Sequence, residues 1–137
     1  YELKDILPNT KYNLKFKYTT TENGQTIIKE FSNTTISTQK PKISLKVTKT
    51  RAGEITYVIT TDNSYKLTSA DLVVTITDSR TGETRKETST ISINTNKDNI
   101  KKLDKMTEGD IIELKLINVK SDDTIIKGIT ASDKFIY

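Results

Sequence analysis

Apolar and polar residues alternate with a period of two along most of this sequence. In residues 12–18 every second side chain is apolar, beginning at Tyr12. Because successive side chains of a strand point to opposite faces, this pattern predicts a half-buried strand. Asn23-Gly24 follows, a pair that tolerates the positive φ of a tight hairpin turn, and residues 26–37 then read as the returning strand.

The same alternation recurs from residue 43 to the end, with turn residues every 8 to 15 positions. The predicted strands are residues 43–48, 55–60, 72–77, 90–93, 111–116, 124–129 and 135–137. Residues 72–77 are the best candidate for a central strand, and one helical turn is the most that residues 97–105 are expected to form. This spacing is typical of a sandwich or a barrel, so the predicted class is all-β.

Length and composition narrow the picture further. The 137 residues suffice for one sandwich domain of about 100 residues, with about forty to spare. The absence of Cys excludes disulfides and thiolate metal sites, and no apolar run approaches the length of a membrane-spanning helix. The sequence begins within a strand-like pattern and without an initiator Met, which indicates a fragment or a processed product.

The beginning of the chain is similar to its end. Leu14 recurs as Leu114, 100 positions later, and the Thr-Ile-Ile-Lys run of residues 26–29 recurs at residues 124–127, 98 positions later. The matches come in the same order and share one strand–turn–strand layout. They predict an internal repeat with a period near 100 residues, which is the size of one sandwich domain.

Residues 6–12, Ile-Leu-Pro-Asn-Thr-Lys-Tyr, resemble the corner between strands E and F of a fibronectin type III domain. The resemblance implies that Tyr12 forms a tyrosine corner, with its hydroxyl bonded to the backbone near the turn, and that Pro8 has a structural role there. The second copy departs from the motif. Ile112 stands where the Tyr would be, and Glu-Gly at residues 108–109 replaces Pro-Asn, so its corner must be held in another way.

The resemblance also implies a domain layout. Residues 42–137 would be a complete immunoglobulin-like, fibronectin type III-like sandwich, and residues 39–41 a linker. Residues 1–38 would be strands E, F and G of a partial second sandwich, which exposes an apolar face and open edges. The missing strands come either from another segment or chain, or the first forty residues pack on the second domain; the sequence leaves both open.

Candidate chemistry is sparse because His, Cys and Trp are absent. Ser–His–Asp and Cys–His catalysis and His-ligated zinc are thereby excluded, and the five glycines form no phosphate-binding loop. The carboxylates considered are Asp62, Asp71, Asp78, Asp98, Asp104, Asp110, Asp122 and Asp123. We expect no catalytic residue, cofactor or metal; Asp122-Asp123 is a candidate for Ca²⁺ with loop carbonyls, but an ordinary turn is the favoured interpretation.

Charge and aromatic residues bear on partners. The net charge is +4, and the densest basic group, Lys4 to Lys17, is diluted by acidic residues, so we expect no nucleic-acid partner. Four aromatic residues are predicted to lie in the core: Tyr12, Phe16, Tyr18 and Tyr57. Tyr65, in a polar loop, is the one aromatic residue expected to be exposed and is the candidate ligand contact.

These observations predict a non-catalytic structural and interaction module. Fibronectin type III-like repeats with this Lys/Thr/Asn/Ile composition resemble those of tail, baseplate and fibre proteins of phages that infect Gram-positive bacteria. The resemblance implies a spacer or docking domain in a virion or at a cell surface, with other protein chains, or further copies of this one, as partners. The alternative is a domain of a secreted bacterial adhesin, or a glycan-binding accessory module of a polysaccharide-degrading enzyme.

Overall fold

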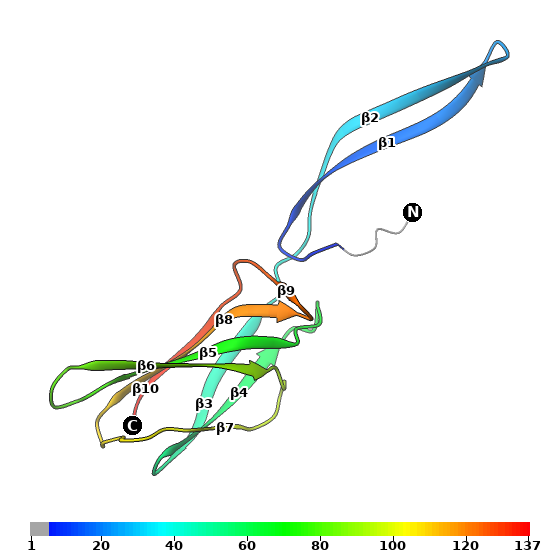
Figure 1. The fold of residues 1–137 in the computed structure, drawn as a ribbon. Coiled ribbons are helices and arrows are strands. Elements are labelled where there is room, and N and C mark those ends of the chain that lie inside the picture. The colour runs from blue at the N-terminus through cyan, green and yellow to red at the C-terminus, as the bar shows by residue number, and fades with distance from the viewer. Residues whose placement is uncertain (1–5) are drawn as a thin grey trace. The chain divides into compact units, whose positions relative to one another are not determined.

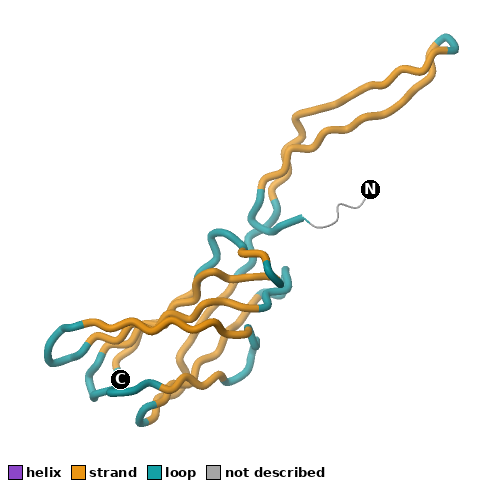
Figure 2. The backbone as a smooth tube through the Cα atoms, viewed as in Figure 1, coloured by secondary structure: helices purple, strands orange, loops and turns teal. Residues whose placement is uncertain are grey.

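The computed structural model describes residues 6–137, except for the side chains of residues 31–34. All regular structure in the described residues is β-strand, ten strands in total, which confirms the all-β class (Figure 2). The chain divides into two compact units, Tyr1–Lys40 and Pro41–Tyr137, called unit 1 and unit 2 below. The division falls within the linker predicted at residues 39–41.

Unit 1 is a long antiparallel hairpin of β1 (Lys11–Glu22) and β2 (Gln25–Ser37) (Figure 1). Its turn is the predicted Asn23-Gly24, with φ of 50° and 75°. The register shifts between Leu14 and Phe16, and such a β-bulge increases the local twist. These two strands correspond to the predicted F and G; the predicted E strand falls largely on residues 1–5, outside the described residues.

Unit 2 contains two antiparallel sheets (Figure 1). The first has the order β3-β4-β7 and consists of β3 (Ile43–Arg51), β4 (Glu54–Thr61) and β7 (Asn99–Lys102). The second has the order β10-β8-β5-β6, with the two-residue strand β9 also paired to β8. Its strands are β5 (Ser69–Thr77), β6 (Thr84–Ser92), β8 (Ile111–Ser121), β9 (Thr124–Ile125) and β10 (Ala131–Ile136).

The two sheets of unit 2 enclose one hydrophobic core. Alternate residues are buried in β5 from Ala70 to Ile76 and in β4 from Ile55 to Ile59, and β5 pairs on both edges, as predicted for a central strand. The buried apolar residues are Leu45, Ile55, Tyr57, Ile59, Ala70, Leu72, Val74, Ile76, Leu103, Ile112, Leu114, Leu116, Val119, Ile126, Ile129 and Ala131. Burial of Tyr57 confirms its predicted place in the core and raises the pKa of its hydroxyl.

Hydrogen bonds join the two sheets where β3 lies beside β10. The backbone N–H of Val47 donates to Asp133 Oδ2 at 2.7 Å. The hydroxyl of Tyr137 donates to the carbonyl of Arg51 at 2.8 Å and accepts from the N–H of Gly53 at 2.9 Å. The C-terminal aromatic side chain therefore holds the β3–β4 turn.

Charged side chains line the opposite side, where the edge strand β6 presents Arg85 and Glu87 on its inner face. Glu87 lies 3.8 Å from the ammonium group of Lys101 on β7. The guanidinium of Arg85 donates to the backbone carbonyls of Asp104 and Lys105. Inward-pointing charges on an edge strand disfavour pairing with a strand of another molecule.

Several predicted boundaries are corrected by the structure. Residues 97–105, for which one helical turn was the most expected, contain a strand instead, because Asn99–Lys102 forms β7 and pairs with β4. Only Thr124–Ile125 of the predicted strand 124–129 is a strand, since Gly128 turns the chain with a φ of 73°. Strands β6 and β10 begin several residues earlier than the apolar pattern indicated.

Candidate functional site

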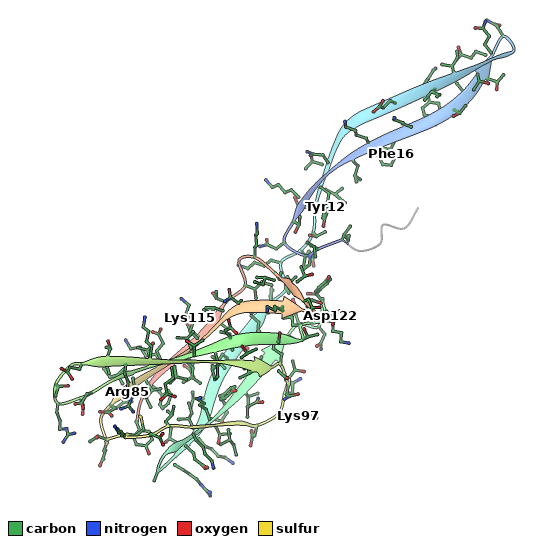
Figure 3. The ribbon with its side chains drawn as sticks, viewed as in Figure 1. Tyr12, Phe16, Arg85, Lys97, Lys115 and Asp122 are labelled. Atoms are coloured by element: carbon green, nitrogen blue, oxygen red, sulfur yellow. The ribbon has the colours of Figure 1, made fainter. Side chains whose placement is uncertain are left out.

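One face of the unit 1 hairpin carries the aromatic side chains of β1, while the aliphatic Ile28 of β2 lies on the other face. Tyr12, Leu14 and Phe16 are successive alternate residues of β1, and Phe16 and Tyr18 are 49% and 43% exposed. The prediction that Phe16 and Tyr18 lie in a core is therefore wrong for this chain, because the described hairpin is a single layer (Figure 3). The opposite face of β1 presents exposed lysines.

The same positions in unit 2 are fully buried, whereas in unit 1 Tyr12 and Leu14 are partly buried and Phe16 is exposed. Ile112, Leu114 and Leu116 of β8 are each 0% exposed and belong to the core. They stand 100 positions after Tyr12, Leu14 and Phe16 in the repeat. The exposed face of unit 1 thus corresponds to the face that unit 2 buries between its sheets.

The turn before β1 is fixed by side-chain hydrogen bonds. The Tyr12 hydroxyl accepts from the backbone N–H of Leu7 at 2.7 Å, which is the bond expected of a tyrosine corner. The Thr10 hydroxyl donates to the carbonyl of Pro8 at 2.8 Å, and Pro8 itself is buried. Asn9 has a φ of 50°, a conformation that Asn adopts more readily than most residues.

The corresponding turn of unit 2 is held by Asp110, which is only 2% exposed. Its Oδ2 accepts from the N–H of Thr107 at 2.9 Å, and its Oδ1 accepts from the N–H of Ser79 at 3.0 Å. The hydrogen bonds from Ser79 and Thr107 lower the pKa of this carboxyl. Because Thr107 lies 100 positions after Leu7, a carboxylate in unit 2 binds the backbone N–H that a tyrosine hydroxyl binds in unit 1.

Sequence reasoning counted Asp110 only among the carboxylates and missed this role. The available signal was its place directly before a buried strand, two residues ahead of the position that lacks the Tyr. Asp commonly accepts hydrogen bonds from nearby backbone N–H groups in turns. A corner that has lost its tyrosine therefore favours Asp nearby as the substitute.

Tyr65 lines a shallow pocket of about 300 Å³. The pocket is formed by Thr61, Asn63, Tyr65, Lys66, Leu67, Ile93 and Thr95. The prediction of an exposed ring is corrected, because Tyr65 is partly buried and packs against the core of unit 2. Leu67 and Ile93 draw the ring inward by offering apolar surface that the polar neighbours in sequence did not reveal.

A smaller pocket of about 150 Å³ contains both acidic and basic groups. It is lined by Ile76, Asp78, Glu83, Thr84, Arg85, Lys105 and Asp110. Both oxygens of Asp110 already accept backbone N–H groups, so this carboxylate serves the fold. Asp78 likewise accepts from the N–H groups of Arg80 and Thr81 within its own turn.

The remaining acidic candidates are dispersed over unit 2. Hydrogen bonds from Ser64 lower the pKa of Asp62, and hydrogen bonds from Asn118 and Thr90 lower that of Asp71. Asp98 and Asp104 are exposed in the loops on either side of β7.

Asp122 and Asp123 are exposed in the β8–β9 turn, and the φ of 51° at Asp122 suits an ordinary turn residue (Figure 3). Within residues 6–137 no group of three or more acidic side chains is placed to hold a metal ion. The described residues also include no helix that is long and apolar enough to cross a membrane.

Comparisons with models of protein families, with curated proteins and with solved structures find no match to this chain. The geometry of the chain itself therefore carries the functional inference.

Proposed function

We propose that this chain is a non-catalytic structural and interaction module, a spacer or docking domain of a larger assembly. The observation that carries the proposal is the apolar face of unit 1, where Phe16 is 49% exposed while its counterpart Leu116 is fully buried. Exposed apolar faces of this kind mark sites where proteins associate. Unit 2 encloses a hydrophobic core of its own.

The fold within this proposal is an immunoglobulin-like sandwich of the fibronectin type III kind. Two sheets around one core, joined through antiparallel pairs, support the sandwich class. The bond from the Leu7 N–H to the Tyr12 hydroxyl supports the fibronectin type III-like corner in unit 1. A tail, baseplate or fibre protein of a phage, in a virion or at a cell surface, is the assembly that the resemblance to fibronectin type III-like repeats of this composition implies.

One observation favours the second candidate, a glycan-binding module. The pocket beside Tyr65 combines an aromatic ring with Asn63, Thr61 and Lys66, which are side chains that bond to sugar hydroxyls. A sugar platform gains affinity from broad aromatic area, however, and Tyr65 offers one partly buried ring. The docking role is therefore the better supported of the two.

Two assays on the 137-residue chain separate these functions. We expect a hydrophobic dye such as ANS to bind the chain, and the dye signal to fall in Phe16→Ser but not in Tyr65→Ala. We expect no heat when bacterial cell-wall polysaccharide is titrated into the chain. Heat that disappears in Tyr65→Ala would establish the glycan-binding function instead, and a chain that binds no dye would contradict an accessible apolar face.

A further inference from the structure

We infer that unit 1 binds a partner segment that forms several β-strands and resembles residues 41–100 of this chain in sequence and strand pattern. The segment would contact the face of Tyr12, Leu14 and Phe16 and the edge of β1 that is not paired with β2. This inference rests on the proposed function and names the partner of the docking surface. The partner has aliphatic side chains on its inner face and a free strand edge that pairs antiparallel with β1.

The turn that precedes the hairpin has the same backbone geometry in the two units. Asn9 in unit 1 and Gly109 in unit 2 both have positive φ, 50° and 92°, at the same place in the turn. The chain after each hairpin returns to this turn: the N–H of Thr38 donates to the carbonyl of Thr10, and that of Tyr137 donates to the carbonyl of Asp110. Strands β1 and β2 therefore occupy the places of β8 and β10.

Unit 2, in which the equivalent face of β8 is buried, shows which residues pack against such a face. In unit 2 the residues Ile112, Leu114 and Leu116 share one core with Leu45, Ile55 and Ile59 from the sheet β3-β4-β7. The equivalent face of unit 1 carries Tyr12, Leu14 and Phe16. Aliphatic strand residues are thus the surface that the face of Tyr12, Leu14 and Phe16 is suited to contact, because burial of apolar side chains favours association.

The unpaired edge of β1 favours a β-strand as the partner over a lipid or a glycan. In unit 2, β8 pairs with β10 on one edge and with β5 on the other, from Ile111 to Lys120. Among the described strands β1 pairs only with β2. Its second edge presents backbone N–H and C=O groups in the spacing that an added strand satisfies.

The lysines on one face of the hairpin indicate that the partner binds the other face. Lys11, Lys15 and Lys17 are exposed on the face away from Phe16. Burying these ammonium groups against an apolar sheet would be strongly unfavourable unless they were paired with opposite charges. The partner therefore covers the aromatic face and leaves Lys11, Lys15 and Lys17 in water, while Lys29, which lies opposite Tyr18 on the aromatic face, is paired with Glu22 at 3.4 Å.

The test adds a copy of residues 41–100 in front of the 137-residue chain, because the two repeats are offset by 100 positions. Hydrogen exchange, measured by mass spectrometry, compares the amides of β1 and β2 in the extended chain and in the original one. We expect exchange in the extended chain to slow by about 100-fold or more, as for amides that enter a cooperative core. Unit 2 of the same molecule reports that the chain has folded.

Two variants of the extended chain make the test specific to the face. Phe16→Asp should remove the added protection, whereas Ile28→Asp should preserve it, because Ile28 is 70% exposed and pairs with Thr19 on the opposite face. Three results would each overturn the inference: no added protection while unit 2 is intact, equal effects of the two variants, or protection in the original chain that grows with concentration and so identifies a second copy as the occupant. The first of these leaves dye binding by the original chain unchanged, so it does not touch the proposed function.

Discussion

Replacing Asp110 by Asn is the sharpest perturbation of the unit 2 corner. The carboxylate accepts one N–H from the turn before β8 and one from the turn after β5, at 2.9 and 3.0 Å. An amide of the same shape turns one of its two acceptors into a donor, which then faces an N–H group. It also removes the charge that strengthens the other bond.

The magnitude follows from these two bonds. A hydrogen bond to a charged group contributes about 1.5–3 kcal/mol, and Ser79 is exposed, so water compensates part of its loss. We expect Asp110→Asn to lower the free energy of unfolding of unit 2 by about 3 kcal/mol at pH 7. That is a large share of the 5–15 kcal/mol that typically stabilises a domain, so the midpoint of urea unfolding should fall clearly.

The dependence on pH provides a second signature. Because the folded-state pKa of Asp110 lies below its ordinary value, the ionised carboxylate stabilises unit 2 fully above the unfolded-state pKa of about 4. This contribution is lost as the pH falls through the lowered folded-state pKa. The difference between the original chain and Asp110→Asn should therefore shrink between about pH 5 and pH 2.

Urea unfolding followed by circular dichroism, at several pH values, measures both effects. Asp98→Asn is the matched control, since Asp98 is exposed and the same charge is removed. The reasoning is refuted if Asp110→Asn costs less than about 0.5 kcal/mol at pH 7, the range of ordinary surface changes. A cost that stays constant down to pH 2 would refute the role of the ionised form.

Four further substitutions test the packing and turns of unit 2 by urea unfolding. Leu114→Ala should lower the free energy of unfolding by about 2–5 kcal/mol because it opens a cavity at a fully buried position. Ile136→Ala, at a side chain that is 72% exposed, should change it by less than about 0.5 kcal/mol. Similar effects of the two variants would contradict the assigned core. Tyr137→Phe should cost about 1–2 kcal/mol through the loss of two hydrogen bonds at the β3–β4 turn, and a neutral effect would show that this bond pair is not formed in solution. Gly82→Ala should cost about 1–2 kcal/mol, because φ is +75° and open space around the added methyl leaves backbone strain as the only penalty; a stabilising effect would contradict this turn geometry.

Strand positions and turns were accessible from the sequence because they depend on local chemistry. Alternation around Leu72 and Val74 identified β5 and its inner face, which the structure confirms. Asn23-Gly24 and Gly82 marked their turns because few other residues tolerate positive φ. Each of these signals lies within a few residues of the feature that it predicts.

Features that depend on distant segments were not accessible. Strand β7 reads Asn-Ile-Lys-Lys and becomes a strand only because the edge of β4 is available to pair with it. Tyr65 lies in a polar stretch, and the apolar surface that draws it inward comes from Ile93, 28 positions away. Periodicity placed Phe16 on an apolar face, but it carries no information on whether another layer covers that face.

The inward-pointing charges of the edge strand β6 affect how unit 2 behaves at high protein concentration. At high local concentration, an unprotected edge strand pairs with the edge strands of neighbouring molecules, and repeated pairing leads to fibrils. Arg85 donates to the backbone carbonyl of Asp104, and Glu87 pairs with Lys101. Pairing of another strand with β6 would be unfavourable because it would desolvate or displace these two charged side chains. The edge strand of unit 2 is thus protected against pairing with the edge strands of other molecules.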